Sequence, residues 1–316
     1  MTDQLQDKIR GVIFGNAIGD AIGLGTEFMP KDMVTARYPE GLTEYGQIVQ
    51  DGHRRRWKPG EWTDDTNQML CILNSLIIHK RVDVLDIANE IWKWAHSDGR
   101  GIGRTVYGAI ASSLFKENPL EVARKNWERS QKKSAANGGI MRTAIVGVWD
   151  YKNSVNIKYN AEQVCKITHY DPRCVGSCVM VCLIISALLQ EQTSNNSLLQ
   201  YVLSEGDNYD IRIRQYLDKH LQPDIACLEL YEPSSIGYTL KALSAGLWAL
   251  QYANSFEIGI SSIIHEGGDA DTNGAVAGAI LGAKFGYNAL PSHWKDGLIK
   301  KDWLLNKTNL LIDLIS

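Results

Sequence analysis

Residues 5–24 read LQDKIRGVIFGNAIGDAIGL, and within this stretch glycines stand at Gly11, Gly15, Gly19 and Gly23. Apolar and small residues recur there at the spacing of an α-helix. Every fourth residue lies on the same face of a helix, so the four glycines form a stripe. Such a stripe lowers helix propensity but lets another backbone or a ligand approach closely. We therefore predict a helix that packs tightly against another part of the protein.

Helical periodicity continues along the rest of the chain. No window alternates apolar and polar residues over enough positions to require a strand, although short strand pieces around residues 47–50 are an alternative. No linker, low-complexity tract or repeat of fixed period interrupts the chain. We expect an all-α fold, a single compact orthogonal bundle of roughly a dozen helices, with one domain over residues 1–316. Besides the first helix, the predicted helices are 66–79, 84–96, 104–116, 119–127, 139–148, 161–168, 174–190, 198–203, 209–220, 237–252, 256–265 and 273–285.

The composition is that of a folded protein with balanced charge. Of 316 residues, 44% are hydrophobic, and 33 Lys+Arg stand against 36 Asp+Glu for a net charge of −3. A disordered chain has far fewer apolar residues. Because a near-neutral chain has no broad positive field, we expect no general nucleic-acid binding. The basic run His53-Arg54-Arg55-Arg56 is typical of a solvated loop.

The apolar runs and the cysteines predict a cytoplasmic protein with no membrane association. Residues 175–189 are fewer than the roughly 20 needed to cross a bilayer, so they are predicted to form a buried helix. The first residues lack the pattern of a secretory signal. The six cysteines lack the dense spacing of a disulfide framework and are expected to be reduced thiols. Three of them, Cys174, Cys178 and Cys182, have no fourth ligand at metal spacing, which favours small buried side chains over a soft-metal site.

Two acidic clusters carry the strongest chemical signal. The first, Thr63-Asp64-Asp65-Thr66, opens an amphipathic helix, and taken alone it fits an ordinary helix start with Thr63 as the N-cap. The second, Gly268-Asp269-Ala270-Asp271-Thr272, lies about two hundred residues later, and capping needs only one of its two acids. Carboxylate and hydroxyl oxygens are hard ligands of the type that Mg²⁺, Mn²⁺ and Ca²⁺ prefer.

If both helix starts converge, four carboxylates meet and repel one another unless divalent cations lie between them. One ion needs fewer acids than this, so two ions roughly 3.5 to 4 Å apart are the natural count. The sequence therefore predicts a binuclear hydrolase. The predicted metal ligands are Thr63, Asp64, Asp65, Asp269, Asp271 and Thr272.

Two glycine-rich segments lie immediately before predicted helices. They are Asp98–Thr105 (DGRGIGRT) and Asn137–Arg142 (NGGIMR). Backbone N–H groups exposed at such places can bind phosphate oxygens. Each segment alone fits an ordinary turn equally well, but two of them beside a metal-type acidic pair indicate a diphosphate ligand.

Five motifs occur in order between residue 9 and about residue 286. They are Gly15-Asn16-Ala17-Ile18-Gly19-Asp20-Ala21 followed by Glu27, Thr63-Asp64-Asp65-Thr66, Asn137-Gly138-Gly139-Ile140-Met141-Arg142, Thr168-His169-Tyr170-Asp171 and Gly268-Asp269-Ala270-Asp271-Thr272. Together they resemble the ADP-ribosylglycohydrolases. That family includes the ADP-ribosylarginine hydrolases and the hydrolase that reactivates dinitrogenase reductase.

The resemblance implies an all-α fold with two Mg²⁺ or Mn²⁺ ions in a cleft that binds ADP-ribose. The six predicted metal ligands correspond to ligands in the family. Glu27 corresponds to the acidic residue beside the metals and Asp98 to an acid proposed as the base in some members, so these two are the candidate catalytic residues. The residues that correspond to ADP-ribose contacts are Gly101, Gly103, Asn137, Gly138, Gly139, Met141 and His169.

Some assignments rest on the resemblance alone. Without it, His169 is first read as a core histidine, and a general acid is a further alternative. The short segment Ser235–Thr239 stands where the family often places a loop that lines the ligand site. No tryptophan is assigned to adenine, because most tryptophans at helical spacing belong to the core. The tryptophans considered are Trp57, Trp62, Trp92 and Trp94.

The implied reaction is metal-dependent hydrolysis of the glycosidic bond between ADP-ribose and an acceptor such as an arginine side chain. We expect a monomer whose partner is an ADP-ribosylated protein or another ADP-ribosylated acceptor. Two alternatives remain open, a catalytically inert ADP-ribose-binding protein and a two-metal phosphohydrolase that attacks the diphosphate. The product distinguishes the two hydrolases, because glycosidic cleavage releases ADP-ribose whereas attack on the diphosphate releases AMP.

Overall fold

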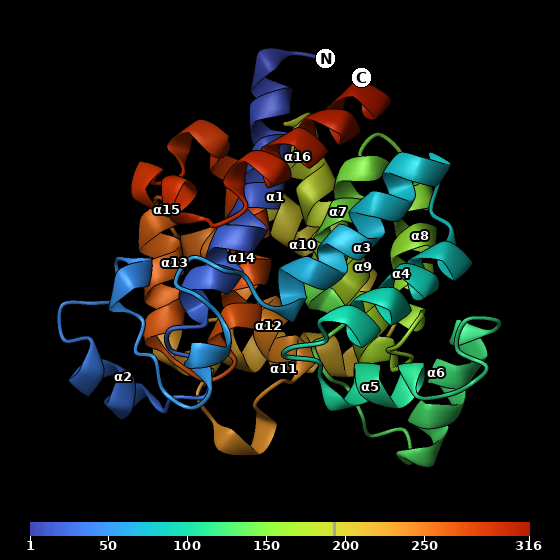
Figure 1. Ribbon diagram of the computed structural model, residues 1–316, viewed down its shortest axis with the longest axis horizontal. Helices are drawn as coiled ribbons and strands as arrows, with labels where there is room; N and C mark the ends of the chain where they lie inside the picture. The colour runs from blue at the N-terminus through green and yellow to red at the C-terminus, as the bar shows by residue number, and fades with distance from the viewer. Residues whose placement is uncertain (192–193) are drawn as a thin grey trace.

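The glycine-striped first helix runs into the middle of the molecule and packs backbone to backbone against another helix (Figure 1). The computed structural model describes residues 1–191 and 194–316, and α1 (Asp3–Gly23) lies against α14 (Ala270–Phe285). A Cβ atom added to Gly15 would overlap the carbonyl oxygen of Gly278, and one added to Gly278 would overlap that of Gly15. Since only hydrogen fits between the two backbones, the predicted tight packing is confirmed.

The predicted all-α fold is also confirmed. Over the two described ranges the chain forms sixteen α-helices, and its only β contact is one isolated bridge between Ala136 and Tyr238. The other helices are α2 (Lys31–Arg37), α3 (Asp64–His79), α4 (Val84–Ser97), α5 (Arg104–Ile110), α6 (Pro119–Arg129), α7 (Ile140–Trp149), α8 (Ser154–Lys166), α9 (Pro172–Gln190), α10 (Asn195–Asp207), α11 (Ile211–His220), α12 (Thr239–Tyr252), α13 (Phe256–His265), α15 (Ser292–Gly297) and α16 (Lys301–Ile315).

The structure differs from the predicted helices in a few places. α2, α15 and α16 were not predicted; the first two have seven and six residues, too short for a clear apolar period. The strand pieces considered around residues 47–50 are wrong, because Tyr45–Gln47 is a 3-10 helix. The helix predicted over 104–116 ends at Ile110, where the Ser112 hydroxyl accepts from a nearby backbone N–H and favours a turn.

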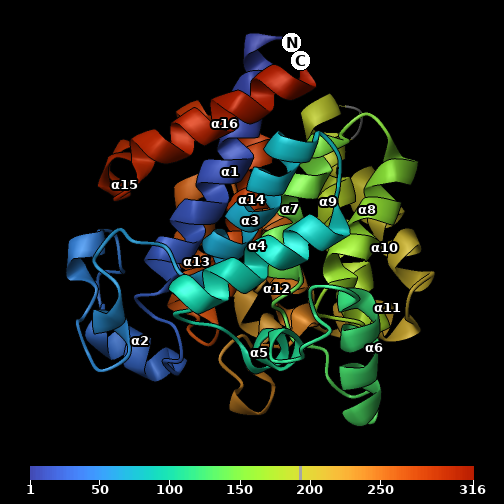
Figure 2. The same cartoon turned by 45° about the vertical axis from the view of Figure 1, so that its right-hand side comes forward.

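α9 is a long apolar helix that belongs to the core. By length and composition it passes the test for a membrane span, but 83% of its most apolar window is buried inside the fold. It packs against α7, α8, α10, α12 and α14, the first three of which surround it in Figure 2. Its cysteines Cys174, Cys178 and Cys182 are buried free thiols, as predicted. The apolar run is therefore a buried helix of the bundle.

The starts of α3, α7 and α14 meet beside a crossing of two loops. The backbone N–H of Asn137 donates to the carbonyl oxygen of Gly237 at 2.9 Å, and that of Thr239 donates to Ala135 at 3.0 Å. These bonds hold the loop before α7 against the loop before α12. Residues at the starts of α3, α7 and α14 face one cavity.

Candidate active site

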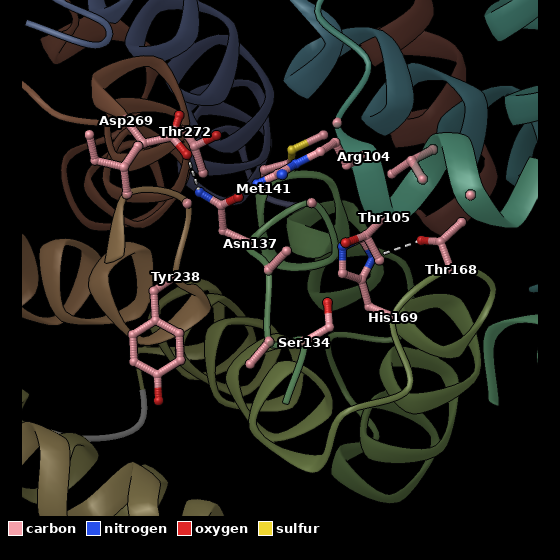
Figure 3. Close-up of a pocket in the computed structure, with 18 of the residues that line it drawn as sticks. Arg104, Thr105, Ser134, Asn137, Met141, Thr168, His169, Tyr238, Asp269 and Thr272 are labelled. Atoms are coloured by element: carbon pink, nitrogen blue, oxygen red, sulfur yellow. Dashed lines mark hydrogen bonds between the residues drawn. The ribbon is translucent and has the colours of Figure 1, made fainter. Parts of the chain in front are cut away.

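A cavity of about 1080 Å³ lies where these helix starts meet. Figure 3 shows Asn137, Asp269 and Thr272 on one side of it, and His169 on the other side, with Met141 between them. The rest of the wall comes from residues within 27–28, 64–65, 101–108, 123–138, 168–170 and 233–238. The last of these shows that the loop considered around Ser235 does line the cavity.

Acidic side chains from three segments of the chain converge in the cavity wall. Carboxylate oxygens of Glu27, Asp269 and Asp271 all lie within 4.8 Å of one another. The Thr63 hydroxyl lies 3.4 Å from Asp65 Oδ2 and 3.5 Å from Asp271 Oδ2, so it joins the start of α3 to the start of α14. Asp64, Asp65 and Thr272 also line the cavity, whereas Thr63 is not among its lining residues. The two helix starts therefore meet, as their repeated acidic pattern suggested.

The electrostatics of this cluster favour a cation. Burial raises the pKa values of Asp64, Asp65 and Asp271 well above their ordinary value, and the neighbouring carboxylates raise them further. The Oδ1 atom of Asp65 is buried without a hydrogen-bond partner among the described residues. A divalent ion would supply both that partner and the countercharge, and hard oxygens are what Mg²⁺ and Mn²⁺ prefer. The residues present therefore fit a metal centre.

Asp20, on α1, caps α3. Its carboxylate accepts hydrogen bonds from the backbone N–H groups of Thr63 at 2.9 Å and of Thr66 at 3.0 Å, and from the Thr66 hydroxyl at 2.6 Å. Thr63 stands at the N-cap position but its side chain makes no capping hydrogen bond, so the alternative that it serves as the cap is wrong. Because an acid from another helix satisfies these N–H groups, the side chains of Asp64 and Asp65 are left to the cavity, and the Thr63 hydroxyl is left to Asp65 and Asp271.

Glu27 is held from two directions. Its Oε2 lies 2.5 Å from His53 Nε2, while Arg54 donates to the backbone carbonyl oxygens of Glu27 and Gly25. Arg56 Nη2 lies 2.6 Å from His53 Nδ1. A guanidinium can only donate, so Nδ1 accepts and the Nε2 proton of His53 points to Glu27. The pKa of Glu27 is raised above its ordinary value, because the effect of burial exceeds the lowering effect of the hydrogen bond from His53.

The basic run that includes these residues is only partly solvated. Arg55 and Arg56 are exposed, but Arg54 is 4% exposed, so the predicted solvated loop is wrong at this position. Asp51 Oδ2 accepts from Arg54 at 2.5 Å, and carbonyl oxygens of the Glu27 loop accept from its other donors. A guanidinium whose donors are satisfied in this way can be buried.

Asp98, the second predicted catalytic acid, lies outside the main cavity. It ends α4, and its Oδ1 accepts from Arg100 Nε at 2.6 Å. Together with Arg100, Glu61 and Trp62 it lines a separate small cavity. Of the two predicted acids, Glu27 is the one that the fold brings to the carboxylate cluster.

Six of the seven predicted ADP-ribose contacts line the cavity. They are Gly101, Gly103, Asn137, Gly138, Met141 and His169. The seventh, Gly139, is buried at the start of α7. Gly101 has a φ of 85°, and a Cβ there would overlap Asp64 Oδ1, so glycine lets this loop lie directly on the acidic cluster. Asn137 Nδ2 donates to Asp269 Oδ2 at 2.7 Å and ties the other loop to the same cluster.

Trp127, Tyr170 and Tyr238 are among the aromatic side chains in the cavity wall, and Trp127 Nε1 donates to Asp171 Oδ2 at 2.9 Å, which orients the indole. Tyr170 and Tyr238 lie in segments that the sequence singled out, but neither was assigned a role. Trp127 was missed, because nothing in its local pattern separates it from a core tryptophan. Asp20 and His53 were also missed, although Asp20 stands inside a motif. The tryptophans weighed from the sequence are absent from the described lining of this cavity, and they are Trp57, Trp62, Trp92 and Trp94.

Comparisons with known proteins agree with this geometry. A family model described as ADP-ribosylglycohydrolase matches residues 1–315. The ADP-ribosylarginine hydrolase Tri1 of Serratia proteamaculans (strain 568) is 28% identical over 308 residues, which cover 95% of this chain and 77% of that protein. The ADP-ribosyl-(dinitrogen reductase) glycohydrolase of Rhodospirillum rubrum is 25% identical over 297 residues, covering 94% and 92%. A solved structure described as an ADP-ribosylglycohydrolase-related protein complex has the same fold, with a TM-score of 0.77, 24% identity and full coverage of both chains.

Proposed function

This chain belongs to the ADP-ribosylglycohydrolase family, whose members hydrolyse glycosidic bonds, and we propose that it removes ADP-ribose from arginine side chains of ADP-ribosylated proteins. The observation that carries the proposal is the meeting of Glu27, Asp269 and Asp271 with the start of α3 in the wall of one large cavity. The similarity to a relative named ADP-ribosylarginine hydrolase supports arginine as the acceptor.

Two Mg²⁺ or Mn²⁺ ions are the proposed cofactors. The residues that would hold them share hard oxygen donors and are Thr63, Asp64, Asp65, Asp269, Asp271 and Thr272. When bound there, the ions would orient the ribose hydroxyl groups and increase the nucleophilicity of water. Proton transfer and substrate binding are carried out by residues of the protein.

Glu27 takes a proton from the attacking water. The hydrogen bond between His53 and Oε2 fixes the carboxylate of Glu27, and its other oxygen is the proposed proton acceptor. As the water oxygen bonds to the anomeric carbon, the electron pair of the glycosidic C–N bond passes to the guanidinium nitrogen. The charged guanidinium thereby leaves as a neutral guanidine, which then takes up the proton that Glu27 removed from the water. An arginine acceptor therefore needs no separate strong acid.

The remainder of the cavity accommodates the nucleotide. We assign the diphosphate to the loop before α7, where the backbone N–H groups of Gly138 and Gly139 stand at a helix start. Trp127 and Tyr170 offer aromatic faces for the adenine. ADP-ribose should therefore bind much more tightly than adenosine, and equal affinities in calorimetry would contradict this placement.

The function is tested with a protein ADP-ribosylated on arginine. The chain should release ADP-ribose in the presence of Mg²⁺ or Mn²⁺ and lose this activity in chelator. Binding of ADP-ribose without release would identify an inert binding protein, and release of AMP would identify a phosphohydrolase. Parallel substrates modified on serine test the choice of acceptor.

A further inference from the structure

A chain of buried hydrogen bonds runs from Asp64 to His169. Gln68 Nε2 donates to Asp64 Oδ2 at 3.1 Å, and Arg142 Nη1 donates to Gln68 Oε1 at 2.6 Å. Arg142 Nη2 donates to Thr168 Oγ1 at 2.7 Å, and that oxygen lies 2.8 Å from His169 Nδ1. All of these side chains are buried. Because these side chains are buried, the bonded atoms along the chain rely on one another as hydrogen-bond partners.

The donors set the direction of each proton. A guanidinium can only donate, so Thr168 Oγ1 accepts from Arg142 and retains its own proton. Within the described part of the chain, His169 Nδ1 is the acceptor to which this hydroxyl is bonded. Nδ1 is then unprotonated, and the proton of a neutral imidazole lies on Nε2. Burial, followed by the charge of Arg142, lowers the pKa of His169 to about 3, which agrees with a neutral ring.

The Nε2 atom of His169 is buried and without a partner among the described residues, although the ring lines the cavity (Figure 3). Gly138 lies beside it: an added Cβ would come within 2.9 Å of Cε1 and 3.1 Å of Nε2. Glycine at this position keeps a side chain from pressing on that edge of the ring. A buried donor without a partner in a cavity wall indicates an acceptor atom on a ligand.

We propose that Gln68, Arg142 and Thr168 are positioning residues that hold His169 as its Nε2–H tautomer, which donates to an oxygen of the bound ligand. The identity of that ligand, ADP-ribose, rests on the proposed function. Its diphosphate and ribose oxygens both accept hydrogen bonds. His169 is then a neutral binding residue, and the proton transfer stays with Glu27.

The test compares Thr168→Val with Thr168→Ser, which keeps the hydroxyl group. Nitrogen-15 NMR of the imidazole rings reports the tautomer in the ligand-free protein, and the His169→Gln spectrum identifies the signal. We expect the Nε2–H form in the wild type and in Thr168→Ser, and its loss as the dominant form in Thr168→Val. Calorimetry should show ADP-ribose binding about tenfold weaker in Thr168→Val and nearly unchanged in Thr168→Ser.

A wild-type Nδ1–H tautomer overturns the proposal, as does a Thr168→Val variant that keeps both the Nε2–H form and the affinity. If the wild type does not bind ADP-ribose, the proposed function fails, whereas the tautomer of the free protein still decides this inference. Should Thr168→Val not fold, Gly138→Ala provides the second test. It should keep the Nε2–H tautomer and weaken ADP-ribose binding at least tenfold in the wild-type background but much less in the His169→Gln background. Unchanged affinity, or equal weakening in both backgrounds, would count against the proposal.

Discussion

The carboxylate of Asp20 accepts two hydrogen bonds from Thr66, one from the hydroxyl at 2.6 Å and one from the backbone N–H at 3.0 Å. These residues lie 46 positions apart, and their contact fixes α1 to the start of α3. Because α1 also packs on α14 through its glycine stripe, one helix positions both acidic segments. The carboxylate cluster is thus a consequence of how α1 packs.

Replacing Asp20 with alanine should lower the free energy of unfolding by about 2 to 4 kcal/mol, because buried N–H groups at the start of α3 lose their acceptor. Asp20→Asn keeps one acceptor oxygen and should have a smaller effect. Urea denaturation measures both variants, with Asp32→Ala on the exposed surface as the control. An effect of Asp20→Ala no larger than that of the control would show that Asp20 does not support α3.

Stability in chelator should fall as the pH rises from about 4 through 6. Burial raises the pKa of Asp20 from 3.8 to about 6. A carboxyl group whose pKa is raised by folding binds its proton more tightly in the folded state, so its contribution is complete below the unfolded pKa and is lost as the pH passes the folded value. The raised pKa values of Asp64, Asp65 and Asp271 act in the same direction.

Melting temperatures from pH 4 to pH 8, with chelator and with Mg²⁺ or Mn²⁺, measure this dependence. The cations should restore stability near neutral pH, because they bind the folded state. A chelated protein that becomes steadily more stable over this pH range would contradict the expectation.

Asp271→Asn should weaken Mg²⁺ or Mn²⁺ binding at least tenfold without unfolding the chain. It should also stabilise the chelated protein near neutral pH, because it removes one buried carboxylate from a repulsive cluster. Calorimetric titration with metal and thermal melting report the two effects. Asp313→Asn, on the exposed face of α16, is the matched control and should change neither. Unchanged metal affinity in Asp271→Asn would place the metal elsewhere.

Glu27→Gln should lower the single-turnover rate about a hundredfold or more under saturating metal, because the proton of the attacking water loses its acceptor. Asp98→Asn should have a much smaller effect, since Asp98 is paired with Arg100 outside the cavity. ADP-ribose affinity is measured in both variants to separate binding from chemistry. Full activity in Glu27→Gln with loss in Asp98→Asn would move the catalytic role to Asp98, and full activity in both would mean that neither acid is needed.

Gly278→Ala should unfold the protein or destabilise it by more than about 3 kcal/mol, because its Cβ would overlap the carbonyl oxygen of Gly15 and force α1 away from α14. The control is Gly46→Ala, whose Cβ would meet nothing within 4 Å. Thermal melting of the two variants makes the comparison. Equal melting temperatures would show that the helices can separate without loss of stability.

Much of this site can be predicted from the residue types in the chain. The helices follow from apolar periodicity, and the repeated pattern of Thr63–Asp65 and Asp269–Thr272 indicates a shared metal-type site. Both the periodicity and the acidic pattern can be recognised within short stretches of neighbouring residues. The glycine stripe of α1 indicates close packing for the same reason. α16 could also have been predicted, because its apolar residues recur at helical spacing, and Leu304, Leu311 and Ile312 are buried in the structure.

Other features depend on contacts between distant parts of the chain. Local pattern assigns the cap of α3 to Thr63, whereas the packing of α1 brings Asp20 to that place. In the same way, His53 reaches Glu27, and Asp98 turns away from the cavity to Arg100. Residue type reveals which chemistry a side chain can perform, but its partners are set by the close packing of helices, which no short stretch of sequence encodes.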